Sequence, residues 1–290
     1  MGVLKYTDLD TTKYRTPNIK EESQAKQFAK LRQSYAELLS RKVDDVLADV
    51  AQRLIDICMS YNIQGKDFTF HYHTELENIV DEVLDDAEAE ILALIEKYAT
   101  TIGDNNENFL QILLAYLSLL GNKNRNLKET LAIYMQRFKE DMEASIAAML
   151  DAKYPVSKAK NEMHTHLHNI EEIPAVASAL HEPQGFQAQL IIDGGQHYDP
   201  DDHSKMRGVP TNGILAVMMM SRIALQMTWD RWQTLDFQQK GASGYYQMRT
   251  GFYPCAKCDE AVGFYEATTW EAYPAVHPNC QCIRIPIFNL

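Results

Sequence analysis

Apolar side chains recur at intervals of three and four residues through most of the first 155 positions of the 290-residue chain. The longest such stretch runs from about Glu21 to Tyr61 and carries leucine, valine and isoleucine at the spacing of one helix face. The sequence NIQGKD, with a glycine in the turn, ends it. This stretch predicts one long helix, with at most a single break.

Three further helices are expected before Pro155. The first is TELENIVDEVLDDAEAEILALIEKYATTIG, where Thr74 and Glu77 predict a capping box and Gly103 marks the expected end. A short, very apolar helix follows in NENFLQILLAYLSLLG, and another runs from NLKETL to the residue before Pro155. The sequence thus predicts a helical bundle over residues 21–155. Residues 1–20 lack this periodicity and are expected to form a flexible arm that orders only on a partner.

Glycine, proline and aspartate become frequent after Pro155. Residues 156–212 are therefore expected to form an irregular connector, with one candidate strand in FQAQLII. A helix is expected next in GILAVMMMSRIALQMTWDRWQTLDF. Near the end, GYYQMR and CIRIPIF are predicted to be short strands that pair. The whole chain is thus expected to be an α+β protein that is mostly α, with residues 213–290 as a small α+β domain.

Four of the five cysteines lie close together near the C-terminus, in the pattern C-x2-C-x18-H-x2-C-x-C. The residues are Cys255, Cys258, His277, Cys280 and Cys282. Thiolate and imidazole are preferred ligands of Zn²⁺, and a C-x2-C turn lets two sulfurs converge on one ion. Since no secretory signal is apparent, a metal is favoured over disulfides.

A tetrahedral site has four places for these five candidates. We expect Cys255, Cys258 and His277 to bind Zn²⁺ together with either Cys280 or Cys282. If both of these cysteines bind the metal, His277 is not a ligand and instead lies next to the ligands. A closed site of four ligands leaves no position for water, so its expected role is structural. The remaining cysteine, Cys58, is expected to be an ordinary core residue.

The segments RTGFYPCAKCDEAVG and HPNCQCIRIP resemble the head morphogenesis domain of tailed phages, the family of phage Mu F-like minor head proteins. The resemblance covers about the last 80 residues. It rests on the C-x2-C, the turn DEAVG that ends at Gly263, and the segment HPNCQC. The helix that carries an arginine in this family would correspond to MSRIALQMTWDRWQT, with Arg222 as the arginine.

The resemblance implies a minor structural protein of a phage head or prophage, with no enzymatic activity and with a zinc-stapled C-terminal domain. Its expected partner is the portal protein, the major capsid protein or both, and a homo-oligomer is allowed. The expected location is the virion, near the portal or inside the head, and the host cytoplasm during assembly.

A second hypothesis concerns the alternating histidines in EMHTHLHNIEE. On a strand, His164 and His168 would share a face about 7 Å apart, and with His166, Asp199 or His203 they could hold a catalytic metal. This would make the chain a metal-dependent hydrolase or nuclease. The flanking residues are polar, however, so solvated histidines are favoured.

Charge and hydropathy limit the other classes of partner. The net charge is −12, which disfavours general nucleic-acid binding because phosphate neutralisation needs basic residues. A zinc-ribbon nucleic-acid binder is kept only as a third alternative. No apolar run reaches the roughly 18–20 residues that span a bilayer, so no membrane contact is expected.

Overall fold

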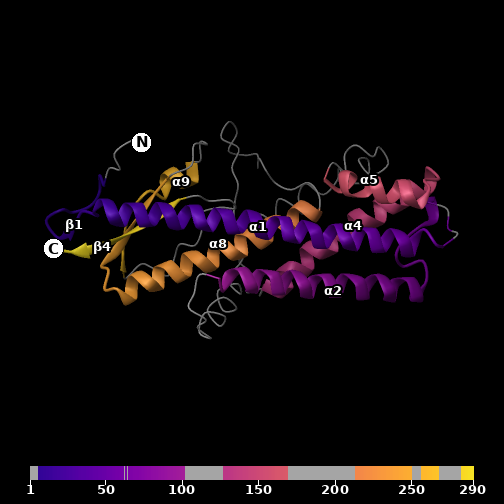
Figure 1. Ribbon diagram of the computed structural model, residues 1–290, viewed down its shortest axis with the longest axis horizontal. Coiled ribbons are helices and arrows are strands. Elements are labelled where there is room, and N and C mark those ends of the chain that lie inside the picture. The colour runs from indigo at the N-terminus through magenta and orange to yellow at the C-terminus, as the bar shows by residue number, and fades with distance from the viewer. Residues whose placement is uncertain are drawn as a thin grey trace.

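The computed structural model describes residues 6–61, 63, 65–101, 127–168, 213–249, 256–267 and 282–290. Within them the chain is mostly helical with one small antiparallel sheet, which confirms the predicted α+β class. Figure 1 shows an elongated molecule, with long helices along its axis and the sheet at one end. None of the described helices is long and apolar enough to cross a membrane.

Helix α1 (Ile19–Cys58) is one continuous helix of 40 residues, so the long helix predicted there is confirmed and has no break. Its start is fixed by a reciprocal cap. The Asn18 side chain accepts a hydrogen bond from the backbone N–H of Glu21 (3.0 Å), and the Glu21 carboxylate accepts one from the N–H of Asn18 (2.8 Å). This capping box pairs two backbone donors that lack partners within the helix.

Helix α2 (Thr74–Ala99) begins one residue earlier than its predicted cap requires. The N-cap is His73, whose Nδ1 accepts a hydrogen bond from the backbone N–H of Leu76 (3.1 Å). The capping box predicted from Thr74 and Glu77 is therefore wrong, because Thr74 is already helical. The Glu77 carboxylate instead contacts Nδ1 of His71 at 2.7 Å. The predicted stop at Gly103 and the short apolar helix after it lie outside the described residues.

Three more long helices follow: α4 (Leu127–Asp151), α5 (Val156–His168) and α8 (Gly213–Gln239). The connector expected over 156–212 is wrong in its first part, since 156–168 is helical. The rest of that range, with the candidate strand FQAQLII, lies outside the described residues. Helix α8 packs against α1, α4 and α2, so it belongs to the bundle and does not open a separate domain at residue 213.

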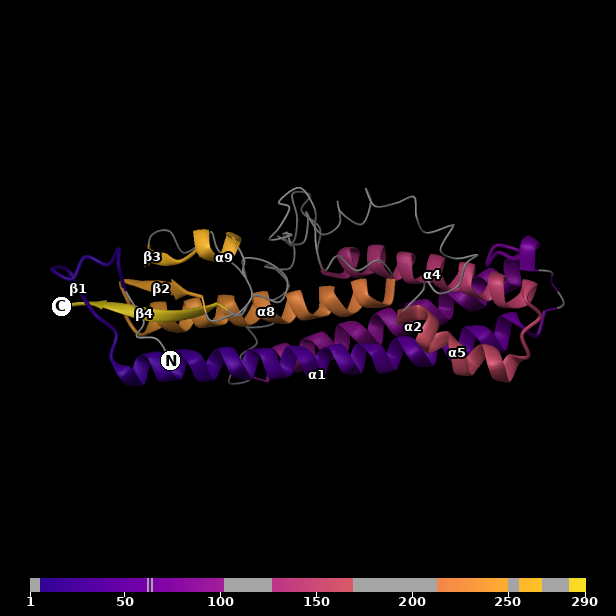
Figure 2. The same cartoon turned by 90° about the horizontal axis from the view of Figure 1, so that it is seen from above.

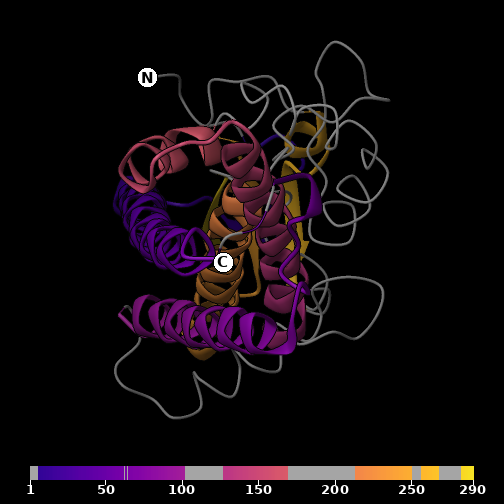
Figure 3. The ribbon, with the colours of Figure 1, turned by 90° about the vertical axis from the view of Figure 1, so that its right-hand side faces the viewer.

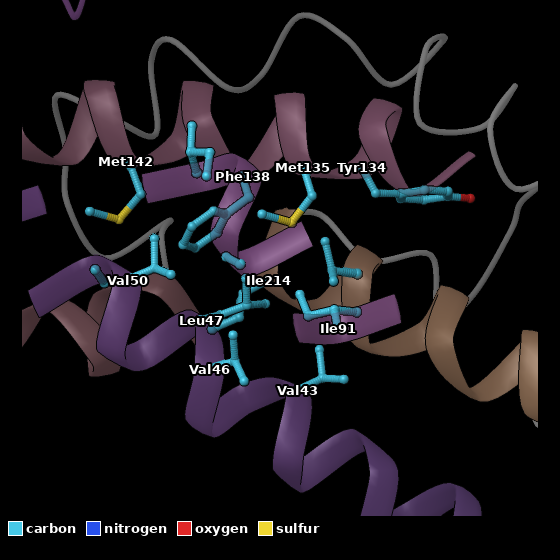
Figure 4. Close-up of a cluster of buried hydrophobic side chains, with 14 of the residues drawn as sticks. Val43, Val46, Leu47, Val50, Ile91, Tyr134, Met135, Phe138, Met142 and Ile214 are labelled. Carbon is cyan, nitrogen blue, oxygen red and sulfur yellow. The ribbon is translucent and has the colours of Figure 1, made fainter. Parts of the chain in front are cut away.

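The core forms where these helices meet around the long axis (Figure 3). Figure 4 shows side chains from different helices packed together, among them Leu47 and Val50 of α1, Ile91 of α2, Phe138 of α4 and Ile214 of α8. All five are at most 2% exposed. Burying each such side chain contributes about 1.5–3 kcal/mol, so this packing is a main stabilising contribution of the bundle.

The sheet has the strand order β1-β4-β2-β3, and all its pairs are antiparallel. Figure 2 shows it beside the end of α8. Its strands are β1 (Tyr14–Arg15), β2 (Gly244–Met248), β3 (Gly263–Glu266) and β4 (Ile283–Asn289). The predicted pairing of GYYQMR with CIRIPIF is confirmed by the β2–β4 register, in which Tyr246 lies opposite Ile285.

The N-terminal segment, residues 6–18, packs on this sheet. Leu9 is buried in an apolar cluster with residues of β2 and β4, and the ring of Tyr6 meets Tyr246 edge-on, with centroids 5.0 Å apart. The Asp8 carboxylate accepts hydrogen bonds from the Tyr246 hydroxyl and from the N–H of Phe264 (2.9 Å). Burial tends to raise the pKa of Asp8, but these hydrogen bonds lower it below its usual value. In its described part the expected flexible arm is thus ordered by the chain's own sheet.

A buried carboxylate joins α4 to the start of α8. Asp141 is fully buried, and it accepts a hydrogen bond from the backbone N–H of Gly213. Gly213 lies so close to α4 that a Cβ there would come within 2.4 Å of the backbone of Phe138. Burial raises the pKa of Asp141 to about 6, although the Arg137 guanidinium (3.4 Å) and the Gly213 hydrogen bond lower it.

This carboxylate is expected to make the protein less stable as the pH rises from about 4 to 6. The folded-state pKa lies above the usual aspartate value of 3.8, so the native state holds a proton that the unfolded state releases. Asp141→Asn keeps an acceptor for Gly213 and should remove up to about 3 kcal/mol of this pH dependence. Urea unfolding between pH 4 and 8 measures it. Asp151→Asn, at an exposed position of α4, is the control. Equal pH profiles for wild type and Asp141→Asn would contradict the prediction.

Candidate metal centre

Two of the five residues that the sequence assigns to a zinc site lie within the described part of the chain. Cys258 is in the short helix α9 (Ala256–Glu260), and Cys282 directly precedes β4. Both are buried, with exposed fractions of 4% and 6%. The other three lie outside the described residues: Cys255, His277 and Cys280.

The register of the sheet brings Cys258 and Cys282 to the same end. Near the end of β2, Gln247 lies opposite Gly263, the first residue of β3, and Met248 lies opposite Ile283, the first residue of β4. Strands β3 and β4 therefore both begin where β2 ends. They are the two neighbours of β2, so their axes are roughly 10 Å apart. The segments that carry the two cysteines thus enter the sheet at the same end, on either side of β2.

The segment around Cys258 is attached to the sheet by its neighbours. The Arg249 guanidinium, just after β2, donates to the Asp259 carboxylate at 2.6 Å. The Tyr265 hydroxyl donates to the backbone carbonyl of Ala261 at 3.0 Å. These contacts hold α9 against β2 and β3.

A buried group of charges lies beside the start of β4. Asp230 of α8 forms ion pairs with Arg32 of α1 and with Arg284 of β4, the second at 3.6 Å. The three side chains are only 3–5% exposed. Arg284 also donates to the backbone carbonyl of Asp230 (3.2 Å) and lies over the ring of Tyr245 (5.2 Å). We call Arg32, Asp230 and Arg284 the buried charge network.

This network holds the backbone of β4 as well as its side chains. Arg32 donates to the carbonyl oxygen of Cys282 at 2.8 Å, and Gln233 of α8 lies 3.5 Å from that of Arg284. Further along the strand, Pro286 has no N–H, and Phe288 pairs with β1. The edge of β4 is therefore occupied by other groups of the chain, which protects it from pairing with a foreign strand.

Sequence reasoning missed the buried charge network. A signal was present, because Arg32 lies seven residues after Ala25 and four before Ala36, on the apolar side of α1. A charge at such a position is rarely buried unless it is paired. The sequence carries no indication, however, that its partner would be Asp230, 198 positions away.

The fit to zinc rests on the two cysteines that can be placed. Buried sulfurs at one end of a small sheet suit a closed structural site. Among the residues that the structure describes, no three histidines, cysteines or acidic residues converge on a common point, so Cys258 and Cys282 supply at most part of the ligand set. A site of this kind would cross-link segments of the fold.

The remaining cysteine and the histidines have other surroundings. Cys58 is fully buried in the helical core, and burial raises the pKa of its thiol to about 12, as expected for an unreactive core residue. The backbone is helical through His168, so the strand arrangement of His164, His166 and His168 is wrong. The further candidates of that hypothesis, Asp199 and His203, lie outside the described residues.

A groove of about 880 Å³ opens between the start of α1, the end of α8 and β4. Aromatic side chains contribute much of its lining: Phe28, Trp232, Phe237 and Phe288. Leu31 at its side is 45% exposed. Such a lining suits contact with another molecule.

The chain matches no known family model, no curated protein and no solved structure. A fold of helices and a small sheet does not define an activity, because the same architecture serves many functions. The features of this chain that bear on its function are the cysteines, the buried charge network and the groove.

Proposed function

We propose that this chain is a minor head protein of a tailed phage or prophage, a structural component without enzymatic activity. The observation that carries the proposal is that the segments carrying Cys258 and Cys282 enter the sheet at one end, within the sequence pattern CAKC and HPNCQC. A site of this type serves to fold a small, loop-rich end of a chain. The chain would be located in the virion, and in the host cytoplasm during assembly.

The proposed zinc ligands are Cys255, Cys258 and His277, with either Cys280 or Cys282 as the fourth. When bound, zinc would supply a cross-link between the segments that precede β3 and β4. In the described sheet, β2 lies between the strands that follow those segments. A metal held by four protein ligands needs no open position for water, in agreement with a structural role.

The proposed partner is the portal protein or the major capsid protein. The groove beside α1 offers an apolar surface next to charged side chains, among them Lys20 and Asp236. Interfaces of this kind combine an apolar centre with a polar rim. The acidic charge of the whole chain is in keeping with a protein partner.

Co-sedimentation with the portal tests this proposal. The chain would be co-expressed with the head proteins encoded beside it and centrifuged on a density gradient. We expect it to migrate with portal or capsid assemblies, and Leu31→Glu in the groove to release it. Ser34→Glu, at an exposed position of the same helix, should leave it bound. Failure of the wild-type chain to associate with any head protein would overturn the proposed function.

A further inference from the structure

The start of β4 is held by a helix of the bundle, and this suggests a role for Arg32 beyond stability. We propose that Arg32 is a positioning residue for the metal centre, which acts by fixing the backbone of Cys282. The inference rests on the zinc site of the proposed function. It concerns a residue far from the cysteine pattern in sequence, on a helix that carries none of the proposed ligands.

The Asp230 carboxylate orients the guanidinium of Arg32 toward Cys282. One of its terminal nitrogens is paired with the Asp230 carboxylate, and the other donates to the carbonyl of Cys282 at 2.8 Å. Since the guanidinium is planar, fixing one nitrogen sets the direction of the other. The position of the Cys282 carbonyl is thus linked to the packing of α1 against α8.

The following residues of β4 are held in the same way, which keeps the strand from shifting. Arg284 contacts the carboxylate and carbonyl of Asp230, and its own carbonyl lies 3.5 Å from the Gln233 amide. All of these groups are at most 6% exposed. The segment from Cys282 to Arg284 is therefore positioned by the bundle.

The other described cysteine depends on different contacts. The segment of Cys258 is attached through Asp259 to Arg249, and the start of β3 is attached to Asp8. The two cysteines are thus carried by separately anchored segments. Groups outside the ligand set that orient the ligands commonly change metal affinity 10- to 100-fold when removed. Arg32 meets this condition for Cys282, because it donates to the Cys282 carbonyl from outside the ligand set.

The test compares the metal affinity of Arg32→Gln with that of wild type, by zinc competition against a chromophoric chelator. We expect the apparent dissociation constant to rise about 10- to 100-fold. The absorption spectrum of the Co²⁺-loaded protein should change as well, because it reports sulfur geometry. Arg41→Gln, at an exposed position of the same helix, should behave as wild type in both measurements.

Arg32→Lys keeps a positive charge beside Asp230, so this variant should fold. It lacks the planar guanidinium, so it should bind zinc more weakly than wild type. A second readout uses wild type alone: removing zinc should speed hydrogen exchange of α1 amides near Arg32. If wild type binds no zinc, the proposed metal centre fails. If wild type binds zinc but the folded Arg32 variants hold it equally tightly, with an unchanged Co²⁺ spectrum, only the role of Arg32 is overturned.

Discussion

Replacing Asp230 by asparagine is expected to lower the free energy of unfolding by about 3–5 kcal/mol. The substitution removes a carboxylate that pairs with both Arg32 and Arg284. Two guanidinium groups would then remain buried without their negative partner, in a region where the three side chains are 3–5% exposed. Chemical denaturation monitored by circular dichroism measures this loss.

The matched control is Asp236→Asn, six residues later on the same helix. Asp236 pairs with Lys240 at 2.6 Å, but the Lys240 side chain is 62% exposed. A surface pair of this kind contributes roughly 0–1 kcal/mol, so the control should unfold almost as wild type does. Similar losses for the two variants would show that the buried charge network does not join the bundle to the sheet as described.

Loss of the metal is the second large effect. The purified chain is expected to carry stoichiometric zinc, and Cys258→Ala is expected to carry none, because a structural site depends on all four ligands. Structural zinc contributes an apparent 10–16 kcal/mol to the folding of small zinc domains. The C-terminal segment of the variant should therefore become sensitive to protease. Elemental analysis and limited proteolysis measure the two effects.

Cys58→Ala serves as the control, since Cys58 is buried in the helical core and belongs to no proposed site. It should keep its zinc. The single variants Cys280→Ala and Cys282→Ala decide which of these two cysteines binds the metal, since only the ligand should be essential. A wild-type protein without zinc, purified in the absence of chelators, would refute the metal centre.

Elements with a local pattern could be predicted well. The long helix α1 follows from its apolar repeat, and the pairing of β2 with β4 follows from the composition of two short segments. The order of the N-terminal segment could not be predicted, because DLDTTKYRTPN has no periodicity. That segment is ordered by contacts such as the hydrogen bond of Asp8 with Tyr246, 238 positions away.

The candidate site, too, has one part that follows from the local sequence and another that depends on distant contacts. The types and spacing of the proposed ligands come from the cysteine pattern, because metal preference is a property of the side chains themselves. That Cys258 and Cys282 enter the sheet at one end depends on the register of β3 and β4 against β2. The strand arrangement of His164, His166 and His168 was wrong, because alternation along a short polar stretch does not distinguish a strand from a helix.

The sequence by itself determined the helical class and one strand pair, since each depends on neighbours a few positions apart. The zinc site that the cysteine pattern indicates stays a prediction. Only the tertiary structure decided that α8 belongs to the bundle and that Arg32 meets both Asp230 and the carbonyl of Cys282. The last two contacts join residues 198 and 250 positions apart. Contacts of this range depend on how whole elements pack against each other, and no local pattern records that packing.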